Sequence, residues 1–423
     1  MSSLLHVALL GAPFSTLTYG VPPHFQGWEL PPGLRVAVPV GRSLRAGVVL
    51  GPAEQAPPGV TLKDFVWPLE LSPLLTPGYV ALARNLAARQ MAEVGQVLAT
   101  LLPAGLKTAR ATLSFVHGGK KLKFRLNDLG SSPVPPDRLA VAWRGAEALL
   151  TVSAAEPEPA YRLLVDPPWP VRPAASMQLA VLEMLFARGQ ATASQLREAL
   201  GPTVTAALRS LETKGRIVLG PPPEEPEEEN GPALPPDDPG AGHPPLTPEQ
   251  QAALDALAPL LERGSGGERL VHGVTGSGKT RLYFELARRA MDMGRSVILL
   301  APEVALAAAL RARAQAWFGT APIYSHGYQT PARRERAFRE AAQSRTPRLI
   351  VGTRSALFLP LADLGLIIID EEHDASFKQD ERLPYQAKEV AFFRARQEKA
   401  LLLLGSATPD VKTYQAALDG LTP

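Results

Sequence analysis

Hydrophobic and polar positions change their pattern several times along the chain, and each pattern predicts a different kind of structure. Between residues 5 and 50, short apolar runs such as VALLGAPF and LRVAVPVG alternate with Gly and Pro. Short strands joined by tight turns produce this pattern, so we expect a small β-barrel or sandwich. From Thr76 to Leu102 the apolar residues recur at helical spacing after a Thr-Pro start. This spacing predicts a helix with proline at its first position.

The next segment, RATLSFVHGGKKLKFR at residues 110–125, predicts a β-hairpin that turns at Gly118-Gly119. Its second strand is basic, and two interpretations of that charge remain open. The lysines could keep an exposed edge strand from pairing with another chain, or the hairpin could contact phosphate groups of DNA. The basic side chains concerned are Lys120, Lys121, Lys123 and Arg125.

Residues 174–220 contain three short helical patterns followed by a strand pattern: SMQLAVLEMLFARG, TASQLREALG, TVTAALRSLETKG and RIVLG. Three helices closed by a β-wing are typical of the winged-helix fold, in which the third helix reads DNA. Winged helices also dock proteins, so contact with DNA and contact with a protein both remain open.

Residues 221–246 interrupt every pattern, because ten of these 26 residues are proline and seven are acidic. Such a composition predicts an extended linker that repels itself, and an acidic mimic of DNA is the alternative.

After Leu246, runs rich in Val, Ile and Leu, such as SVILLAP and LGLIIIDE, alternate with amphipathic helical patterns. This alternation predicts a doubly wound parallel sheet built from βαβ units.

Composition narrows the function classes. The chain has 423 residues and a net charge of +3, with 45% hydrophobic and 20% charged residues, which is ordinary for a globular protein. No run approaches 18 apolar residues, and the N-terminus lacks the basic start of a signal peptide, so we expect a cytoplasmic protein without membrane spans. The absence of cysteine excludes disulfides, thiolate zinc sites and cysteine nucleophiles. A basic segment and an acidic segment in one chain suggest an anionic partner such as nucleic acid.

The strongest chemical signal is GVTGSGKT at residues 273–280, which matches the phosphate-binding loop G-x-x-x-x-G-K-[ST] in full. Its glycines let backbone N–H groups surround phosphate oxygens, Lys279 reaches the β- and γ-phosphates, and the Thr280 hydroxyl is a ligand of Mg²⁺. A strand pattern before the loop and a helix pattern after it give the expected context. We therefore predict that ATP and Mg²⁺ are bound by Gly273, Thr275, Gly276, Ser277, Gly278, Lys279 and Thr280.

A second signal, LGLIIIDEEHD, places acidic residues at the end of an apolar strand, where ligands bind in open α/β sheets. Asp370 would hold Mg²⁺, and Glu371 would position or polarise the attacking water. With Lys279, these two form the predicted catalytic set. Ser406 and Thr408 of GSATP follow another apolar strand. They either sense the γ-phosphate or cap the strand. We interpret His373 as part of the coupling machinery and not as a metal ligand.

Three further residues complete the predicted site. Gln250, in LTPEQQAAL, could read adenine or be an ordinary helix-surface glutamine. Thr353 and Arg354 follow a strand in IVGTRS, where they would face a nucleic-acid strand and contact its phosphates.

Together, GVTGSGKT, APEVAL, IVGTRSALFLPLADLGLIIIDEEHDASFKQ and GSATPD resemble the PriA family, superfamily 2 DNA helicases of bacterial replication restart. The N-terminal residues are similar to the family's DNA 3′-end-binding domain, in which Tyr19 would contact DNA. The resemblance implies a multidomain chain with a small all-β N-terminal domain, a winged helix and one RecA-like α/β lobe. The implied domains are 1–105 (3′-end binding, with a trailing helix), 106–173 (connector), 174–220 (winged helix), 221–246 (linker) and 247–423 (helicase lobe 1).

The resemblance also implies partners and an activity: branched DNA such as forks and D-loops, single-stranded-DNA-binding protein, helicase-loading proteins, and ATP-driven translocation from 3′ to 5′. This sequence departs from the family in several places. Thr18 stands where the family has the aspartate that binds the terminal 3′-hydroxyl. The segment LPYQAKEVA at 383–391 differs from the family's coupling segment at Pro384, Gln386, Lys388 and Glu389.

The family also has a second RecA-like lobe with an arginine finger, which contributes about 10³–10⁵-fold to such hydrolysis, and a cysteine-rich zinc module. The sequence contains neither, so no zinc is expected. We therefore expect a replication-restart protein whose nucleotide-binding lobe has weak or no helicase activity. The alternative is the N-terminal part of an active ATP-dependent 3′–5′ helicase, and an unrelated P-loop kinase or transporter-type ATPase comes third.

Overall fold

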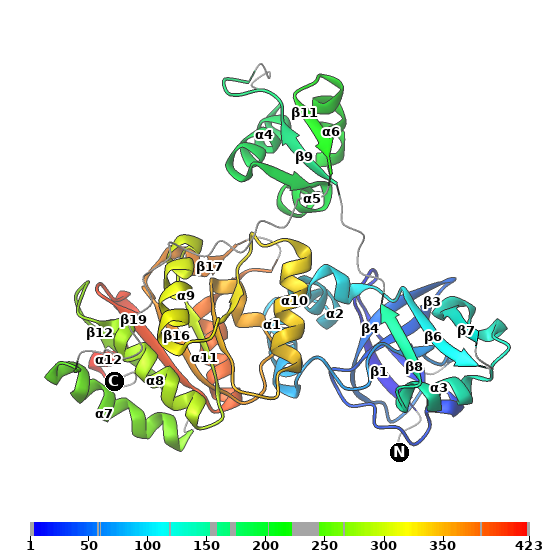
Figure 1. Ribbon diagram of the computed structural model, residues 1–423, viewed down its shortest axis with the longest axis horizontal. Coiled ribbons are helices and arrows are strands. Elements are labelled where there is room, and N and C mark those ends of the chain that lie inside the picture. Colours follow the sequence, from blue (N-terminus) through cyan, green and yellow to red (C-terminus); the bar gives the residue numbers. More distant parts are fainter. Residues whose placement is uncertain are drawn as a thin grey trace. The chain divides into compact units, whose positions relative to one another are not determined.

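The structure is a computed structural model that describes residues 4–56, 59, 61–117, 120–152, 159–169, 175–201, 203–221, 245–264, 267–380 and 383–420. The predicted turn at Gly118-Gly119 and nearly all of the predicted linker lie outside these residues. The chain forms two compact units, one made of residues 1–153 and 230–423 and the other of residues 154–229. Figure 1 shows the elements of both units.

The first unit begins with a five-stranded antiparallel sheet in the order β2-β1-β4-β3-β5. The Gly20 N–H donates to the Lys63 carbonyl (3.0 Å) and the Phe65 N–H donates to the Gly20 carbonyl (3.1 Å), so the two edges of the sheet approach each other. An antiparallel sheet of short strands agrees with the prediction of a small β-barrel or sandwich. The elements are β1 (Leu4–Leu9), β2 (Thr16–Gly20), η1 (Pro23–Phe25), β3 (Arg35–Val40), β4 (Ser43–Pro52) and β5 (Trp67–Pro68).

The single helix predicted after Thr76 is two helices, α1 (Pro77–Arg89) and α2 (Val94–Leu101). The Thr76 hydroxyl caps α1 by accepting from the Tyr79 N–H, with proline at the first position as predicted. The chain then turns at Met91, which has a φ of 49°. A Cβ on Gly95 would lie 2.3 Å from the Leu9 carbonyl oxygen, so α2 packs directly onto the N-terminal sheet. Because α2 packs against the sheet at Gly95, the chain forms two helices where the apolar spacing predicts one.

The predicted hairpin strands are present in a second antiparallel sheet, ordered β7-β6-β8, with β7 at its edge. Leu122 and Phe124 pack against the apolar core, whereas Lys121 and Lys123 are exposed. The elements of this part are η2 (Ala104–Lys107), β6 (Ala111–His117), β7 (Lys120–Arg125), η3 (Leu126–Ser131), α3 (Pro136–Arg144) and β8 (Ala148–Val152).

The second unit has three helices and a three-stranded antiparallel sheet, ordered β10-β9-β11, around an apolar core. The three predicted helices and the closing strand are present. Strand β9 also belongs to the unit, which therefore begins earlier than residue 174. The elements are β9 (Ala160–Leu163), α4 (Ser176–Arg188), β10 (Gln190–Thr192), α5 (Ala193–Leu200), α6 (Val204–Thr213) and β11 (Ile217–Gly220). Its identification as a winged helix remains a prediction.

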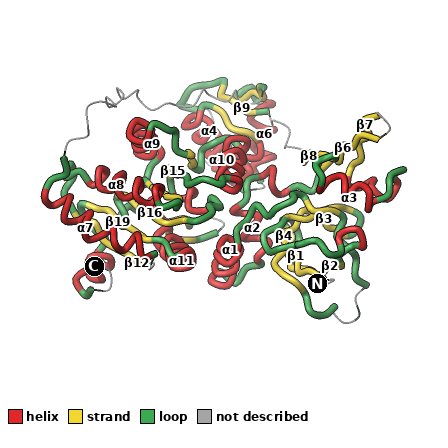
Figure 2. Tube along the Cα trace, turned by 60° about the horizontal axis from the view of Figure 1, so that its bottom comes forward, coloured by secondary structure: helices red, strands yellow, loops and turns green. Residues whose placement is uncertain are grey.

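The rest of the first unit is built on a six-stranded parallel sheet in the order β12-β19-β16-β13-β15-β14, which confirms the predicted parallel sheet (Figures 1 and 2). Helices α7, α8 and α9 share one apolar core with one face of the sheet, and α10 and α11 share another core with the opposite face. The strands are β12 (Gly267–His272), β13 (Ser296–Leu300), β14 (Ile323–Ser325), β15 (Leu349–Gly352), β16 (Leu364–Asp370) and β19 (Leu401–Ser406).

Helices surround this sheet, and a small β-hairpin follows β16. The helices are α7 (Pro248–Arg263), α8 (Lys279–Asp292), α9 (Val304–Phe318), η4 (Arg354–Phe358), α10 (Pro331–Gln343), η5 (Ala375–Phe377), α11 (Ala387–Glu398) and α12 (Val411–Leu418), and the hairpin strands are β17 (Lys378–Gln379) and β18 (Tyr385–Gln386). None of the helices in the described part of the chain is long and apolar enough to cross a membrane.

Candidate functional site

The predicted nucleotide residues meet at one edge of the parallel sheet. Strands β12, β19 and β16 are neighbours, and the carboxyl ends of parallel strands lie at the same edge. The phosphate-binding loop follows β12, Ser406 ends β19 and Asp370 ends β16. The Gly273 N–H also donates to the Ser406 carbonyl (3.2 Å), which joins the loop to the end of β19.

Backbone conformation explains why the loop contains glycine. Gly276 and Gly278 have φ values of 81° and 82°, in the left-handed region that side chains disfavour. Helix α8 begins directly after Gly278 and has no side-chain cap, so its first N–H groups can donate to a bound anion. The Lys279 ammonium donates to the Gly273 carbonyl (2.7 Å), within the loop where phosphates would bind. Thr275 and Ser277 are exposed on the same loop.

Asp370 is held by a residue that the sequence analysis missed. The Tyr283 hydroxyl, from α8, donates to Asp370 Oδ1 (3.0 Å). A Cβ on Gly405 would lie 1.7 Å from this hydroxyl, so only glycine leaves room for it. Burial raises the pKa of Asp370, while the Tyr283 hydrogen bond and the Lys279 charge act in the opposite direction. The sequence predicts a helix after the loop, but its pattern does not show that the Tyr283 hydroxyl reaches the end of β16.

The predicted coupling residues are in direct contact. His373 Nδ1 lies 2.8 Å from Ser406 Oγ, and His373 Nε2 lies 3.3 Å from Thr408 Oγ1. The Thr408 N–H donates to Ser406 Oγ (3.0 Å). Glu371 has a φ of 50° and its Oε2 lies 3.7 Å from His373 Nδ1. The ends of β16 and β19 therefore form one hydrogen-bonded group.

Gln250 is close to the loop, but its amide is engaged by the protein. Its Nε2 donates to the Ser277 carbonyl (2.9 Å), and its Oε1 accepts from the Thr247 N–H (3.1 Å) in a capping box. The structure therefore shows Gln250 supporting the loop and the start of α7, and adenine recognition remains a prediction.

Thr353 and Arg354 lie at the end of β15, and both are engaged within the protein. Thr353 is 8% exposed, and its N–H donates to the Ser325 carbonyl (3.1 Å). Arg354 Nη1 donates to the carbonyls of Ser376 and Lys378. Their contact with DNA phosphates remains a prediction.

Tyr19, in the N-terminal sheet, is engaged within the protein. It is 4% exposed, and its hydroxyl donates to the Pro39 carbonyl (3.2 Å). Thr18, its neighbour on β2, is partly exposed, and its Oγ1 lies 3.4 Å from His6 Nδ1. Contact of Tyr19 with DNA remains a prediction.

The residues present fit a magnesium ion. Among the described residues, no group of three or more His, Cys, Asp or Glu side chains could hold a metal ion. Mg²⁺ in nucleotide sites is held by one or two protein oxygens together with phosphates and water. The Thr280 hydroxyl and the Asp370 carboxylate are oxygen donors of this kind, so they would hold the ion with a bound nucleotide.

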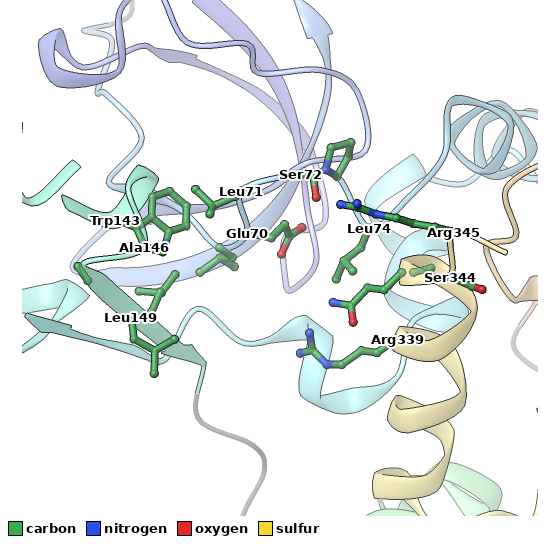
Figure 3. Close-up of a pocket in the computed structure, with 16 residues that line it drawn as sticks. Glu70, Leu71, Ser72, Leu74, Trp143, Ala146, Leu149, Arg339, Ser344 and Arg345 are labelled. Atoms are coloured by element: carbon green, nitrogen blue, oxygen red, sulfur yellow. The ribbon is translucent and has the colours of Figure 1, made fainter. Parts of the chain in front are cut away.

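A separate cavity of about 540 Å³ lies within the same unit between the N-terminal part and α10. Figure 3 shows Trp143, Ala146 and Leu149 on one side and Arg339 and Arg345 on the other. No predicted site residue is among the described residues that line it. The cavity is therefore distinct from the nucleotide site.

Comparisons with known proteins match two different parts of the chain. A model of the DEAD/DEAH box helicase domain matches residues 247–417, and a model of the PriA 3′DNA-binding domain (3′BD) matches residues 6–103. The replication restart protein PriA of Chlamydia pneumoniae is 41% identical over 176 residues, which cover 41% of this chain and 23% of that protein. PriA of Bacillus subtilis (strain 168) is 28% identical over 95% of this chain and 52% of that protein. PriA of Synechocystis sp. is 29% identical over 94% of this chain and 50% of that protein.

The chain thus spans about half the length of the two relatives that it matches over nearly all of its residues. These matches confirm the resemblance to PriA. They also show that a DNA-binding domain and a helicase-type domain are present in one chain.

Proposed function

We propose that this chain is a replication-restart protein that binds branched DNA and binds ATP with Mg²⁺ in its helicase-type lobe. The observation that carries the proposal is the meeting of Lys279, Asp370 and Ser406 at the ends of three neighbouring strands. The matched 3′DNA-binding domain in the same chain supports a DNA partner. Forks and D-loops are proposed as substrates, and single-stranded-DNA-binding protein and helicase loaders as partners, on the resemblance to PriA.

We propose a role for each residue of the site. Backbone N–H groups of the loop and of the start of α8 would bind the phosphates, and Lys279 would exchange its loop carbonyl for a phosphate oxygen. Bound Mg²⁺ would neutralise charge on the phosphates. Glu371 would orient the attacking water, and Ser406, Thr408 and His373 would respond to the terminal phosphate as one hydrogen-bonded group.

We also propose that the 423-residue chain turns ATP over slowly by itself. This proposal is supported by the sequence of residues 383–391, which differs from the family's coupling segment at Pro384, Gln386, Lys388 and Glu389. The alternative, an active helicase of which this is the N-terminal part, predicts rapid turnover once a second lobe is supplied.

The deciding measurement is DNA-stimulated ATP turnover by the purified chain, with nucleotide affinity and binding to a forked duplex measured on the same samples. We expect fork binding and nucleotide binding with little turnover. Lys279→Ala should weaken nucleotide binding by about tenfold or more, because a charged hydrogen-bond donor to phosphate is removed. Robust turnover that disappears in Lys279→Ala would favour the active enzyme, and absence of nucleotide binding would contradict the proposal.

The DNA side has its own test in the hairpin. If β7 contacts phosphates, replacing Lys120, Lys121 and Lys123 with alanine should reduce the slope of log affinity against log salt by about 0.9 for each phosphate that is no longer neutralised. Replacing the same lysines with arginine keeps the charge and should keep the slope. An unchanged slope in the alanine variant would leave these lysines as protection of an edge strand.

A further inference from the structure

Glu372 follows the two predicted catalytic acids, yet it points into the protein. It is 1% exposed, and both of its carboxylate oxygens accept hydrogen bonds. Glu372 Oε2 accepts from Lys388 Nζ (2.7 Å) and from the Thr413 hydroxyl (3.2 Å). Glu372 Oε1 accepts from the Asp410 N–H (2.7 Å). This carboxylate is therefore buried, paired with a charge and fully hydrogen-bonded.

The partners of Glu372 come from the starts of two helices. Lys388 is the second residue of α11, and Asp410 caps α12 by accepting from the Lys412 N–H (2.8 Å). Lys388 Nζ also lies 3.5 Å from Asp410 Oδ2. The Glu372 N–H donates to the Gly405 carbonyl (3.1 Å), which fixes the ends of β16 and β19 together. The network therefore joins the end of β16 to α11 and to the start of α12.

The segments joined in this way carry the nucleotide site. Glu372 is two residues from Asp370, and Asp410 is two residues from Thr408. A buried carboxylate needs its charged partner, and a network in which every group is satisfied favours one arrangement. Removing the ammonium would leave the Glu372 carboxylate buried without its charged partner, and its bonds to the Asp410 N–H and the Thr413 hydroxyl would lose that support.

We propose that Lys388 is a positioning residue for the nucleotide site, acting through the buried carboxylate of Glu372. The pair holds Asp370 and Glu371 in register with Ser406 and Thr408 by tying α11 and α12 to the end of β16. This inference rests on the proposed nucleotide-binding function and adds to it a residue from the segment that departs from the family. A purely structural pair would stabilise the lobe without changing how the site responds to Mg²⁺.

The test uses the full chain and a fluorescent ATP analogue, N-methylanthraniloyl-ATP, titrated with and without Mg²⁺. Lys388→Met removes the charge at similar length, and Lys388→Arg retains it. Lys412→Met is the matched control, because it removes an exposed lysine from the first turn of α12. Hydrogen exchange of the α12 amides is measured on the same variants, and thermal unfolding identifies variants that do not fold.

We expect Lys388→Met to weaken Mg²⁺-dependent nucleotide binding by about 10–100-fold, the range for groups that orient metal ligands. Binding without Mg²⁺ should change less, and the α12 amides should exchange faster. Lys388→Arg should recover both properties, and Lys412→Met should match the unchanged protein. A folded Lys388→Met variant with unchanged affinity would overturn the proposal, and so would a loss that Lys388→Arg does not recover.

Two outcomes need a second measurement. If Lys388→Met does not fold, Thr413→Val removes one donor to Glu372 and should weaken Mg²⁺-dependent binding by about fivefold; unchanged binding would overturn the proposal. If the unchanged protein binds no nucleotide, the proposed function fails. Hydrogen exchange of the α12 amides then tests the inference separately. Faster exchange in Lys388→Met would support the role of Lys388 in holding α12 to the end of β16, and unchanged exchange would overturn it.

Discussion

The N-terminal sheet and the parallel sheet each contain a buried ion pair, and the two pairs differ in what surrounds them. In the N-terminal part, Arg35 donates to Glu70 Oε2 (2.6 Å) and to the Leu106 carbonyl (2.7 Å). In the lobe, Lys388 donates to Glu372 beside the predicted catalytic acids. Arg35 and Glu372 are each 1% exposed, so burial alone does not separate them.

Topology explains the difference. Parallel strands bring their carboxyl ends to one edge, so a pair at that edge is close to residues from several strands at once. Antiparallel strands have no such common edge, and a buried pair there ties neighbouring segments of a scaffold. Burial of a charged pair therefore indicates a functional role only when the topology places the pair beside other chemical groups.

The largest expected effect breaks the pair in the N-terminal part. Arg35→Met leaves Glu70, which is 13% exposed, without the arginine that pairs with it, while the charge of Arg339 remains. The free energy of unfolding should fall by about 3 kcal/mol, the lower end of the range for breaking a buried pair. Nucleotide affinity should not change. Denaturation followed by tryptophan fluorescence suits this part, which contains Trp28, Trp67 and Trp143. Arg42→Met, at an exposed arginine, is the control. Reduced nucleotide affinity in a folded Arg35→Met variant would contradict the purely structural role of the N-terminal pair.

In the lobe, Gly405→Ala should affect stability and binding together. Its Cβ would meet the Tyr283 hydroxyl, and overpacking of this kind costs about 1–3 kcal/mol. Because the same hydroxyl orients Asp370, Mg²⁺-dependent nucleotide binding should weaken as well. Gly327→Ala is the control, since a Cβ there meets nothing within 4 Å. Loss of stability with unchanged nucleotide binding would contradict the role of the Tyr283 hydroxyl in orienting Asp370.

The pH dependence of stability offers a third contrast. Burial lowers the pKa of His326 from 6.5 to about 4, with Arg333 acting in the same direction. As the pH falls below 6.5, the unfolded chain takes up a proton that the folded chain does not, so the free energy of unfolding falls until about pH 4. Allowing for the partial exposure of the ring, we expect about 1–2 kcal/mol between these limits.

His326→Asn, measured by denaturation at pH 7 and pH 5, should show a smaller loss on acidification than the unchanged protein. His24 in the N-terminal part provides the comparison. Burial also lowers the pKa of His24, but Asp137 and Asp64 favour its charged form. His24→Asn should therefore change the pH dependence less than His326→Asn, and the reverse order would contradict this account.

Sequence alone predicted the parallel sheet and the phosphate-binding loop, because local patterns mark the strands and the motif that follows one of them. It singled out His373, Ser406 and Thr408 as coupling residues but did not predict their contacts with one another. It missed contacts that depend on the third dimension. The Tyr283 hydroxyl reaches Asp370 across 87 positions, and nothing in the spacing of α8 reports this. The burial of Tyr19 was also not foreseen, because resemblance does not give the face of a strand, and its contact with DNA stays a prediction. The break between α1 and α2 reflects the close packing of Gly95, which periodicity does not encode.

The smallest effect concerns two buried tyrosine hydroxyls. Tyr283→Phe keeps the ring and removes one hydrogen bond to Asp370, so Mg²⁺-dependent nucleotide affinity should fall by about 0.5–1.5 kcal/mol, or about two- to tenfold. Tyr79, on α1, is buried too, but its hydroxyl has no hydrogen-bond partner among the described residues. Tyr79→Phe removes an unsatisfied polar group, so stability should hold or rise while nucleotide affinity stays the same.

Titration of the fluorescent nucleotide with and without Mg²⁺ separates the two roles of Tyr283. An equal loss in both conditions would mean that the hydroxyl supports packing and not the orientation of Asp370. Tyr283→Phe could instead lower nucleotide affinity only when Mg²⁺ is present, while Tyr79→Phe leaves affinity unchanged. This result would show that a buried tyrosine hydroxyl supports nucleotide binding in the lobe but not in the N-terminal part. The reason lies in position, because only Tyr283 stands where the ends of three parallel strands meet.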